Sequence, residues 1–349
     1  MNTTRAIFMA AGILLLSARI AAQDKTSKID SLMHALYAAG QFQGSVLVAE
    51  EGRVIYRNGF GYADVRDSLP NSYNIAFYIA SLNKPFTALL IMQLVEAGRM
   101  TTAHTLRDYF PEIKNAKLAD VTIHQLLSHT SGIPDFVDPS VISQKNLTTA
   151  WLTGELNKIT PPSEPGKAFV YANSTYVLLA NIIEQVTGRS YAEHLKIQIL
   201  DKCNMSSSGS LIDGSVPKRL ARGYVKSGSS LVEASYINPA VFTGAGSMFS
   251  TVEDLYQFDQ ALYTEQLISN EFKELIYNSS GTYGYGWFIR SFPGIGKVVY
   301  HEGGIPCFAS ILFRPIEKRY CIILLSNDES TNPYKQSIVK SITGILLAQ

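Results

Sequence analysis

The sequence lacks the features that mark several large functional classes. Lysine and arginine total 30 against 29 aspartates and glutamates, so a formal net charge of +1 gives no electrostatic reason to bind nucleic acid or an anionic membrane surface. No internal repeat or low-complexity tract is present. The three cysteines are an odd number for a disulfide framework, and we expect Cys203, Cys307 and Cys321 to be buried thiols.

Several catalytic and cofactor motifs are also missing. There is no Gly-x-Ser-x-Gly, the nucleophile turn of α/β-hydrolases, and no His-Glu-x-x-His zinc motif. The Gly-x-Gly pairs that begin at Gly244, Gly284 and Gly294 lack the third glycine of a dinucleotide loop, so we interpret them as turns. His124 and His129 have a spacing that does not align on a helix, and we expect structural roles for both. The sequence therefore predicts neither a metal nor a cofactor.

The one apolar run that invites a membrane interpretation lies at the N-terminus. Arg5 precedes an apolar segment at 6–16, and small residues end at Ala22 before the polar Gln23. This order is typical of a secretory signal peptide, and the run is short for a membrane span. We expect a signal peptide at 1–22, export to the periplasm or the extracellular space, and no membrane span after cleavage. An uncleaved signal anchor is the alternative.

The remaining pattern predicts an α+β fold. At 46% hydrophobic and 17% charged residues, the composition is that of a globular protein with a large core. Strand-like runs gather near the two ends of the chain, at 44–49, 53–60, 76–80, 286–289, 297–301, 308–313 and 320–326. Helical patterns mark 29–40 and 334–347 and dominate from 85 to 243. We predict one antiparallel sheet built from both ends, with the terminal helices on one face and a helical part beside it.

Ser81-Leu82-Asn83-Lys84 is the segment around which the functional interpretation is built. A serine hydroxyl is a poor nucleophile at neutral pH and needs a neighbouring base, which a desolvated lysine can supply. Ser-x-x-Lys also begins at Ser215 and Ser337, but only Ser81 has an apolar strand before it and a long helix after it. If that helix begins at Ser81, Lys84 lies about one turn later on the same face. We predict Ser81 as nucleophile and Lys84 as base; a simple helix cap is the alternative.

Two Tyr-x-Asn triplets are candidates for the second proton carrier. Tyr171-Ala172-Asn173 opens an apolar helix after a sharp turn, whereas Tyr236-Ile237-Asn238 runs into a proline. We choose Tyr171, which can share protons with Ser81 and Lys84 as a base or an anchor. Asn173 would offer its amide to the substrate carbonyl.

The opposite wall of such a site needs a basic residue followed by glycine on a strand edge. Lys226-Ser227-Gly228 resembles the turn of a hairpin, whereas His301-Glu302-Gly303-Gly304 ends a strand of the predicted sheet, so we choose His301. The glycines would let a substrate lie against the strand, and the backbone N–H groups of Gly304 and Ser81 would form the oxyanion hole. Tyr283 nearby is expected to pack in the core rather than line the pocket.

Taken in chain order, Ser81-x-x-Lys84, Tyr171-x-Asn173 and His301-x-Gly303 resemble the motifs of the serine β-lactamase and penicillin-binding-protein superfamily, specifically its class C-like branch. That branch includes class C β-lactamases, D-aminopeptidases, DD-carboxypeptidases and family VIII esterases. The resemblance covers nearly the whole mature chain, with supporting similarity at 126–133, 165–166, 244–251, 254–255 and 285–287.

This resemblance implies a β-lactamase-like, transpeptidase-like fold and a serine hydrolase that needs no cofactor. The chain would form one catalytic domain at 23–349, with an α/β part at about 23–84 and 244–349 and a helical part at about 85–243. Catalysis would fall to Ser81, Lys84 and Tyr171, and substrate and oxyanion binding to Asn173, His301, Gly303 and Gly304.

The sequence departs from true β-lactamases at one point of substrate binding. His301 stands where many members of the superfamily have a lysine that helps to hold a substrate carboxylate, and Glu302 stands where they have a hydroxyl residue. A histidine is only partly charged at neutral pH, and a neighbouring glutamate opposes an anionic substrate. The departures favour esters or peptides without a carboxylate at that point.

We therefore expect an exported serine hydrolase that acts through an acyl-enzyme on a small ester or a peptide-like amide. It would be of the esterase type or of the D-amino-acid peptidase and DD-carboxypeptidase type. Its partners would be small molecules, namely an ester, a D-amino-acid peptide or a cell-wall-derived substrate. A class C-like β-lactamase and a non-catalytic penicillin-binding or sensor protein are the alternatives.

Overall fold

The computed structural model describes residues 24–137, 147–211, 216–227, 230–234, 239–278 and 281–348. The expected signal peptide at 1–22 lies outside these residues. In the part of the chain that is described, no helix combines the length and the apolar character needed to cross a membrane.

A six-stranded antiparallel sheet, in the order β10-β11-β12-β13-β1-β2, forms the centre of the fold. The N-terminal hairpin joins the C-terminal meander because β1 pairs with β13, with Val46 opposite Leu324. The predicted sheet built from both ends of the chain is therefore confirmed. Its strands are β1 Gly44–Glu50, β2 Arg53–Phe60, β10 Phe288–Phe292, β11 Gly296–Ile305, β12 Phe308–Pro315 and β13 Cys321–Ser326.

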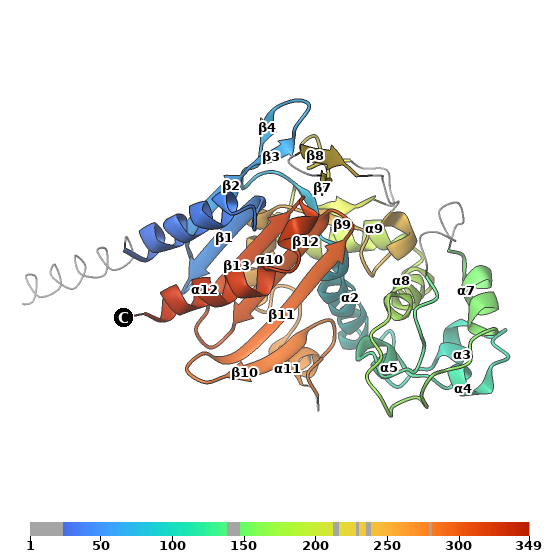
Figure 1. Ribbon diagram of the computed structural model, residues 1–349. Helices are drawn as coiled ribbons and strands as arrows, with labels where there is room; N and C mark the ends of the chain where they lie inside the picture. The colour runs from blue at the N-terminus through green and yellow to red at the C-terminus, as the bar shows by residue number, and fades with distance from the viewer. Residues whose placement is uncertain are drawn as a thin grey trace, which may run out of the picture.

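Helices from the two chain ends cover one face of this sheet, as predicted (Figure 1). They are the helix at 24–38 and α12 Lys335–Leu347. The alternation of side chains along β1 separates the two faces, since Val46 and Val48 pack with these helices while Leu47 and Ala49 belong to the core on the other side. The buried residues between sheet and terminal helices include Ile29, Met33, Ile311, Ile322, Ile338 and Ile342.

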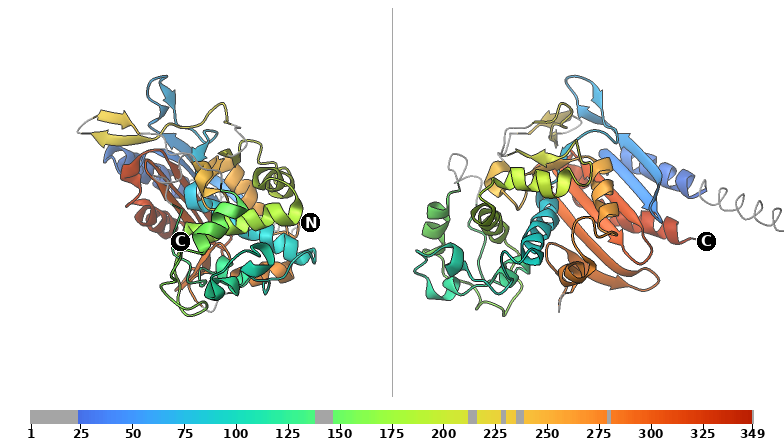
Figure 2. Two further views of the ribbon diagram at one scale, coloured as in Figure 1. Left: turned by 90° about the vertical axis from the view of Figure 1, so that its right-hand side faces the viewer. Right: turned by 180° about the vertical axis from the view of Figure 1, so that it is seen from behind.

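The helical part lies beside the sheet (Figure 2). In the described part of 85–243, helices dominate and three short strands are present. Two of these strands pair as the hairpin expected around Lys226, whereas the third has two residues and is too short to be recognised by its periodicity in the sequence. The helices are α2 Lys84–Glu96, α3 Leu106–Tyr109, α4 Ala116–Ala119, α5 Ile123–Leu127, α7 Thr149–Leu156, α8 Asn173–Thr187, α9 Tyr191–Leu195, the π-helical turn η2 Lys196–Leu200 and η4 Pro239–Phe242.

Smaller elements complete the chain. The short strand β6 belongs to a small sheet with the order β5-β9-β6, and β7 and β8 pair with each other as a hairpin. The strands concerned are β3 Tyr62–Asp64, β4 Leu69–Pro70, β5 Phe77–Tyr78, β6 Gly209–Ser210, β7 Tyr224–Ser227, β8 Ser230–Glu233 and β9 Met248–Ser250. The remaining helices are η1 Ala80–Asn83, α10 Val252–Ala261, α11 Asn270–Tyr277 and η5 Glu329–Thr331.

Helix α2 is apolar on every side because it lies inside the molecule. It contacts α8 and α11, while α10 packs against β1 and β13 on the same side of the large sheet. A helix without a polar face is stable only when it is surrounded by other elements. Its buried residues include Phe86, Leu89, Leu90, Ile91 and Met92. Any polar group carried on the first turn of α2 is therefore removed from water.

A buried ion pair fixes α10 to the sheet. Arg314 on β12 donates to the carboxylate of Asp259 on α10 and to the hydroxyl of Tyr277 at 2.9 Å, and both ion-pair side chains are only 1% exposed. The guanidinium also lies 5.6 Å from the ring centre of Trp287. A buried charge of this kind depends on its partner, since it cannot exchange the partner for water.

Removing the carboxylate should therefore unfold the protein more easily. We predict that Asp259→Asn lowers the free energy of unfolding by about 3–5 kcal/mol, because Arg314 is left buried and unpaired. The control is Glu253→Gln on the same helix, which removes the more exposed ion pair with Arg57 and should cost at most about 1 kcal/mol. Urea unfolding of the three proteins measures both values; equal losses would contradict the role of the buried pair.

Candidate active site

The chain turns sharply at Ser81, but not as the sequence predicted. The α-helix does not begin at Ser81; a 3₁₀ turn, η1, comes first and α2 begins at Lys84. Because a 3₁₀ turn has three residues per turn, residues three apart are aligned along it. The predicted contact is present, with the Nζ of Lys84 at 2.9 Å from the Oγ of Ser81.

The backbone before Ser81 is strained and firmly anchored. Ala80 has a φ of 48°, in the left-handed region that residues with a side chain seldom adopt. Ile79, one residue earlier, donates from its N–H to Met248 and accepts at its carbonyl from the Oγ of Ser310 at 2.7 Å. A Cβ on Gly303 would lie 2.1 Å from this same carbonyl oxygen, so only glycine lets β11 approach the serine turn this closely.

Lys84 is fully buried beside the serine. Its Nζ is within hydrogen-bond distance of Ser81 Oγ, of Asn173 Oδ1 at 2.8 Å and of the carbonyl oxygen of Ala245 at 3.0 Å. Desolvation lowers the pKa of Lys84 to about 7, although the Asp135 carboxylate opposes the change. A neutral amine has two N–H groups for the two carbonyl-type oxygens and a lone pair left for the serine O–H. The geometry thus suits a lysine that accepts the serine proton.

Asn173 begins α8 and is held by a residue that lies outside the predicted motifs. Its Nδ2 donates to Asp135 at 2.8 Å, and the other carboxylate oxygen of Asp135 accepts from the N–H and the hydroxyl of Ser174. An acidic side chain is favourable at a helix N-terminus, where backbone N–H groups are exposed. Asp135 therefore fixes Asn173 so that its amide oxygen faces Lys84.

Tyr171 closes the cluster from the side of the helical part. Its hydroxyl faces Ser81, and the centre of its ring lies 4.8 Å from the Nζ of Lys84. Desolvation raises the pKa of Tyr171 above its usual value, and the interaction with Ser81 opposes the rise only in part. Tyr171 is therefore a neutral phenol rather than a phenolate before reaction. In this form it can relay a proton or anchor the serine.

His301 faces the cluster from β11 as a neutral ring. Burial, with a further contribution from Lys84, lowers the pKa of His301 to about 3. Its Nδ1 lies 2.6 Å from the carbonyl oxygen of Glu302, which can only accept, so Nδ1 carries the proton and Nε2 accepts from the hydroxyl of Tyr283 at 3.2 Å. Tyr283 is buried, as expected of a core residue, but it also orients His301.

Glu302 points away from the site, contrary to the concern raised by the sequence. Side chains alternate along a strand, so Glu302 lies on the opposite face from His301. There its carboxylate is 3.1 Å from the Nζ of Lys335 and accepts from Gln336. Glu302 is therefore paired with α12 and does not oppose an anionic substrate at the serine.

One end of β11 has an open edge beside the serine. The pairing of β10 with β11 ends at Phe288 opposite Tyr300, so among the described strands residues 301–305 are paired on one side only, with β12. Gly304, in this stretch, is exposed. A substrate backbone or acyl group can lie along this edge, where unpaired strand groups supply hydrogen bonds.

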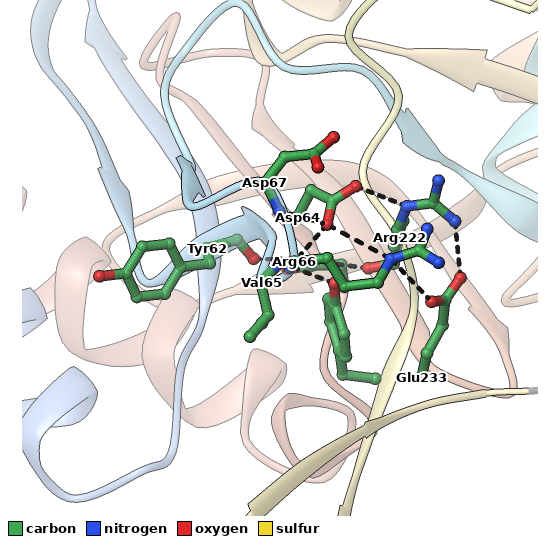
Figure 3. A network of polar contacts seen from close by, with 9 residues as sticks. Tyr62, Asp64, Val65, Arg66, Asp67, Arg222 and Glu233 are labelled. Atoms are coloured by element: carbon green, nitrogen blue, oxygen red, sulfur yellow. Dashed lines mark hydrogen bonds and ion pairs between the residues drawn. The ribbon is translucent and has the colours of Figure 1, made fainter.

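A cavity of about 420 Å³ adjoins the far end of that edge. Ile305, Phe308 and Tyr78 supply its apolar wall, and Tyr78 lies three residues before Ser81. Its polar wall contains a network in which Arg222 binds the carboxylates of Asp64 and Glu233 (Figure 3). The network ties the β3 segment to the β7–β8 hairpin and neutralises most of its own charge.

His129 braces the Tyr171 loop, which agrees with the structural role expected for it. It is fully buried; its carbonyl accepts from the N–H of Val170 at 2.8 Å, and its Nδ1 accepts from the N–H of Ala172 at 3.3 Å. Its ring centre lies 4.4 Å from that of Tyr171. His124 instead pairs through Nδ1 with the hydroxyl of Tyr285, so the two histidines have different neighbours.

The rejected motif copies lie elsewhere. Ser337 is on the exposed side of α12 and its hydroxyl donates to the carbonyl of Tyr334 at 2.7 Å. Lys226 belongs to the β7–β8 hairpin, as expected. Ser215 and the triplet at 236–238 lie outside the described residues. All seven predicted site residues, in contrast, meet at the junction of η1, α8 and β11: Ser81, Lys84, Tyr171, Asn173, His301, Gly303 and Gly304.

Known proteins resemble this chain over most of its length. Penicillin-binding protein 4* of Bacillus subtilis is 34% identical over 356 aligned residues, which cover 94% of this chain and 77% of the relative. The octameric penicillin-binding protein homologue from Pyrococcus abyssi superposes with a TM-score of 0.78 at 30% identity, covering 90% of this chain and 77% of that one.

An enzyme of known activity shares the fold as well. The D-amino acid amidase from Ochrobactrum anthropi SV3 superposes with a TM-score of 0.81 at 25% identity, over 93% of this chain and 98% of the amidase. The sequence model of the family described as Beta-lactamase matches residues 29–344. That match includes every element that builds the site, and the chain therefore belongs to the beta-lactamase family, whose members include serine hydrolases.

Proposed function

We propose that this protein is an exported serine hydrolase that forms an acyl-enzyme at Ser81 with a small ester or a peptide-like amide. The observation that carries the proposal is the contact of 2.9 Å between Ser81 and a fully buried Lys84 whose pKa is lowered to about 7. A lysine of this kind is a base at neutral pH, and an adjacent base is what a serine nucleophile requires. Export rests on the signal-like segment at 1–22.

Acylation follows from the arrangement of the described groups. The Oγ of Ser81 attacks the substrate carbonyl while its proton passes to the neutral amine of Lys84, directly or through the hydroxyl of Tyr171. The new oxyanion is held by the backbone N–H groups of Ser81 and Gly304. Protonated Lys84 then returns the proton, again with Tyr171 as relay, to the leaving alcohol or amine. Water then attacks the acyl carbonyl while its proton passes to Lys84, and the bond to the Oγ of Ser81 breaks as Lys84 returns the proton to this oxygen, which releases the acid.

The charges around the serine indicate the class of substrate. His301 is neutral, and the cation of Lys335 on the other side of β11 is bound to Glu302. A substrate carboxylate at this wall would lose water without meeting a free cation, which is costly. We therefore favour a neutral ester or amide there, and the D-amino acid amidase named above acts within this substrate range.

The cavity beyond Gly304 suits the other half of such a substrate. An acyl group that lies along the open edge of β11 reaches Ile305 and then the apolar wall formed with Phe308. Its volume of about 420 Å³ is that of a site for a small molecule. Because Arg222 is already paired with Asp64 and Glu233, the polar wall suits an uncharged group better than a charged one.

Labelling tests the nucleophile directly. A fluorophosphonate should modify Ser81 in the folded protein, and Ser81→Ala should abolish both the adduct and ester turnover, with a loss of kcat/KM on the order of 10⁴ or more. Intact mass and peptide mapping measure the adduct. The matched control is Ser337→Ala in the other described Ser-x-x-Lys copy, which should keep both properties. An adduct on any other residue would refute the mechanism.

The activity should rise with pH as Lys84 loses its proton. Because desolvation lowers the pKa of Lys84 to about 7, the active neutral form is scarce well below pH 7 and dominant well above it. We predict that kcat/KM for p-nitrophenyl esters increases through a single step centred near pH 7, while the pKa of Tyr171, which is raised, adds no step there. A profile that is flat or falls across pH 6–8 would exclude Lys84 as the base.

Matched substrates test the preference for a neutral group. A D-alanyl peptide with an amidated C-terminus should be cleaved with a kcat/KM about tenfold above that of the same peptide with a free carboxylate, the size of one lost charge-assisted hydrogen bond. A chromogenic cephalosporin, which carries a carboxylate, should also be poor. Equal rates for the amidated and the free peptide would show that the wall at His301 does not select against negative charge.

A further inference from the structure

Lys335, on the far side of the sheet, is in direct contact with the backbone that borders the serine. We infer that Lys335 polarises the peptide group between Gly303 and Gly304 and so strengthens the oxyanion hole. This inference rests on the proposed function, in which the N–H of Gly304 binds the oxyanion. Lys335 is a positioning residue in this scheme, because it touches neither substrate nor Ser81.

The ammonium group of Lys335 has an acceptor for each of its N–H donors. It is the first residue of α12 and only 8% exposed, and its Nζ lies 3.2 Å from the carbonyl oxygen of Gly303, 2.8 Å from Asn332 Oδ1 and 3.1 Å from Glu302 Oε2. An ammonium has three N–H donors, and each has one acceptor here. The group is thus held in one position rather than left to move on the surface.

The position of this cation is costly for the helix that carries it. The N-terminus of an α-helix is positive, so a lysine in the first turn is unfavourable there. Glu302 relieves part of that cost, but the carboxylate alone does not require the bond to the Gly303 carbonyl. We therefore look for a role of the hydrogen bond between Lys335 and the carbonyl of Gly303.

The chemistry of the peptide group supplies the role. The carbonyl of Gly303 and the N–H of Gly304 belong to one planar, conjugated unit, so a positive charge at the oxygen draws electrons from the nitrogen. The N–H then becomes a stronger donor, as in chains of hydrogen bonds that polarise one another. An oxyanion bound at Gly304 gains from this, and more than a neutral carbonyl does, because the benefit grows with its negative charge.

Neighbouring side chains keep this peptide in place. The side chain of Asn332 packs behind Gly304, since a Cβ added there would meet its Nδ2 at 3.4 Å. On the other face, Gly303 lies against the carbonyl of Ile79. The peptide is therefore held from both sides, and Lys335 makes its contact from the α12 side alone.

The test compares Lys335→Met with wild type in three measurements. We expect kcat/KM for a p-nitrophenyl ester to fall about tenfold, mainly in kcat, because a donor is weakened rather than removed. The affinity for phenylboronic acid, whose tetrahedral adduct places an oxygen in the hole, should fall by a similar factor. The carbonyl stretch of a ¹³C-labelled acyl-enzyme should move to higher frequency in the infrared difference spectrum.

Three variants control for structural damage. Lys335→Arg should recover most of the three properties, and Lys340→Met, an exposed lysine on the same helix, should change none of them. If Lys335→Met folds poorly, the double variant Lys335→Met with Glu302→Gln removes both charges, so that no carboxylate is left unpaired, and should show the same frequency shift.

The outcomes distinguish a failure of the role inferred for Lys335 from a failure of the proposed acyl-enzyme mechanism. An unchanged carbonyl frequency and boronate affinity in a folded Lys335 variant would overturn the inference while leaving the acyl-enzyme mechanism in place. Failure of the wild-type protein to form any acyl-enzyme would overturn the proposed function and this inference together. A frequency shift that Lys335→Arg reverses would support the polarising role.

Discussion

The burial of one amine, that of Lys84, is the constraint on which the rest of the site depends. The amine stands at the start of a helix that is apolar on all sides, so water cannot solvate its charge. It faces a hydroxyl and two carbonyl-type oxygens rather than a carboxylate in direct contact, and the cost of desolvation therefore falls on the protonated form. Because no carboxylate contacts the amine directly, its pKa stays low and Lys84 can act as a base at neutral pH.

The fold brings the partners of Lys84 together from distant parts of the chain. The strained turn at Ala80 is held by Met248 and Ser310, and the close approach of β11 depends on a glycine at 303. The large sheet carries β11, and the helical part carries Tyr171 and Asn173. The site therefore forms only when both parts of the domain are folded, and the buried helix α2 contacts both η1 and α8.

The sequence predicted the sheet and the terminal helices, and it selected the seven residues that the structure brings together around Ser81, because each has a local signature, either a period or a fixed spacing. It did not predict the supporting contacts. Asp135 meets Asn173 across 38 residues and Lys335 meets Gly303 across 32, and no spacing rule connects such pairs. The start of α2 was misplaced because a 3₁₀ turn and an α-helical turn have the same composition over four residues. The expectation that Glu302 opposes an anionic substrate was wrong because side chains alternate along a strand, so that Glu302 points away from the site that His301 faces.

A site in which both the lysine base and the facing histidine are neutral must stabilise negative charge largely through dipoles. Burial lowers the pKa of Lys84 to about 7 and that of His301 to about 3, so the deprotonated Lys84 that accepts the serine proton and the ring of His301 both carry no charge before reaction. Backbone N–H groups do not need to be charged to bind an oxyanion, and they stay aligned in a rigid strand. Their strength then depends on what binds the carbonyl end of the same peptide. In this protein that group is the side chain of Lys335, which links the C-terminal helix to the chemistry on the opposite face of the sheet.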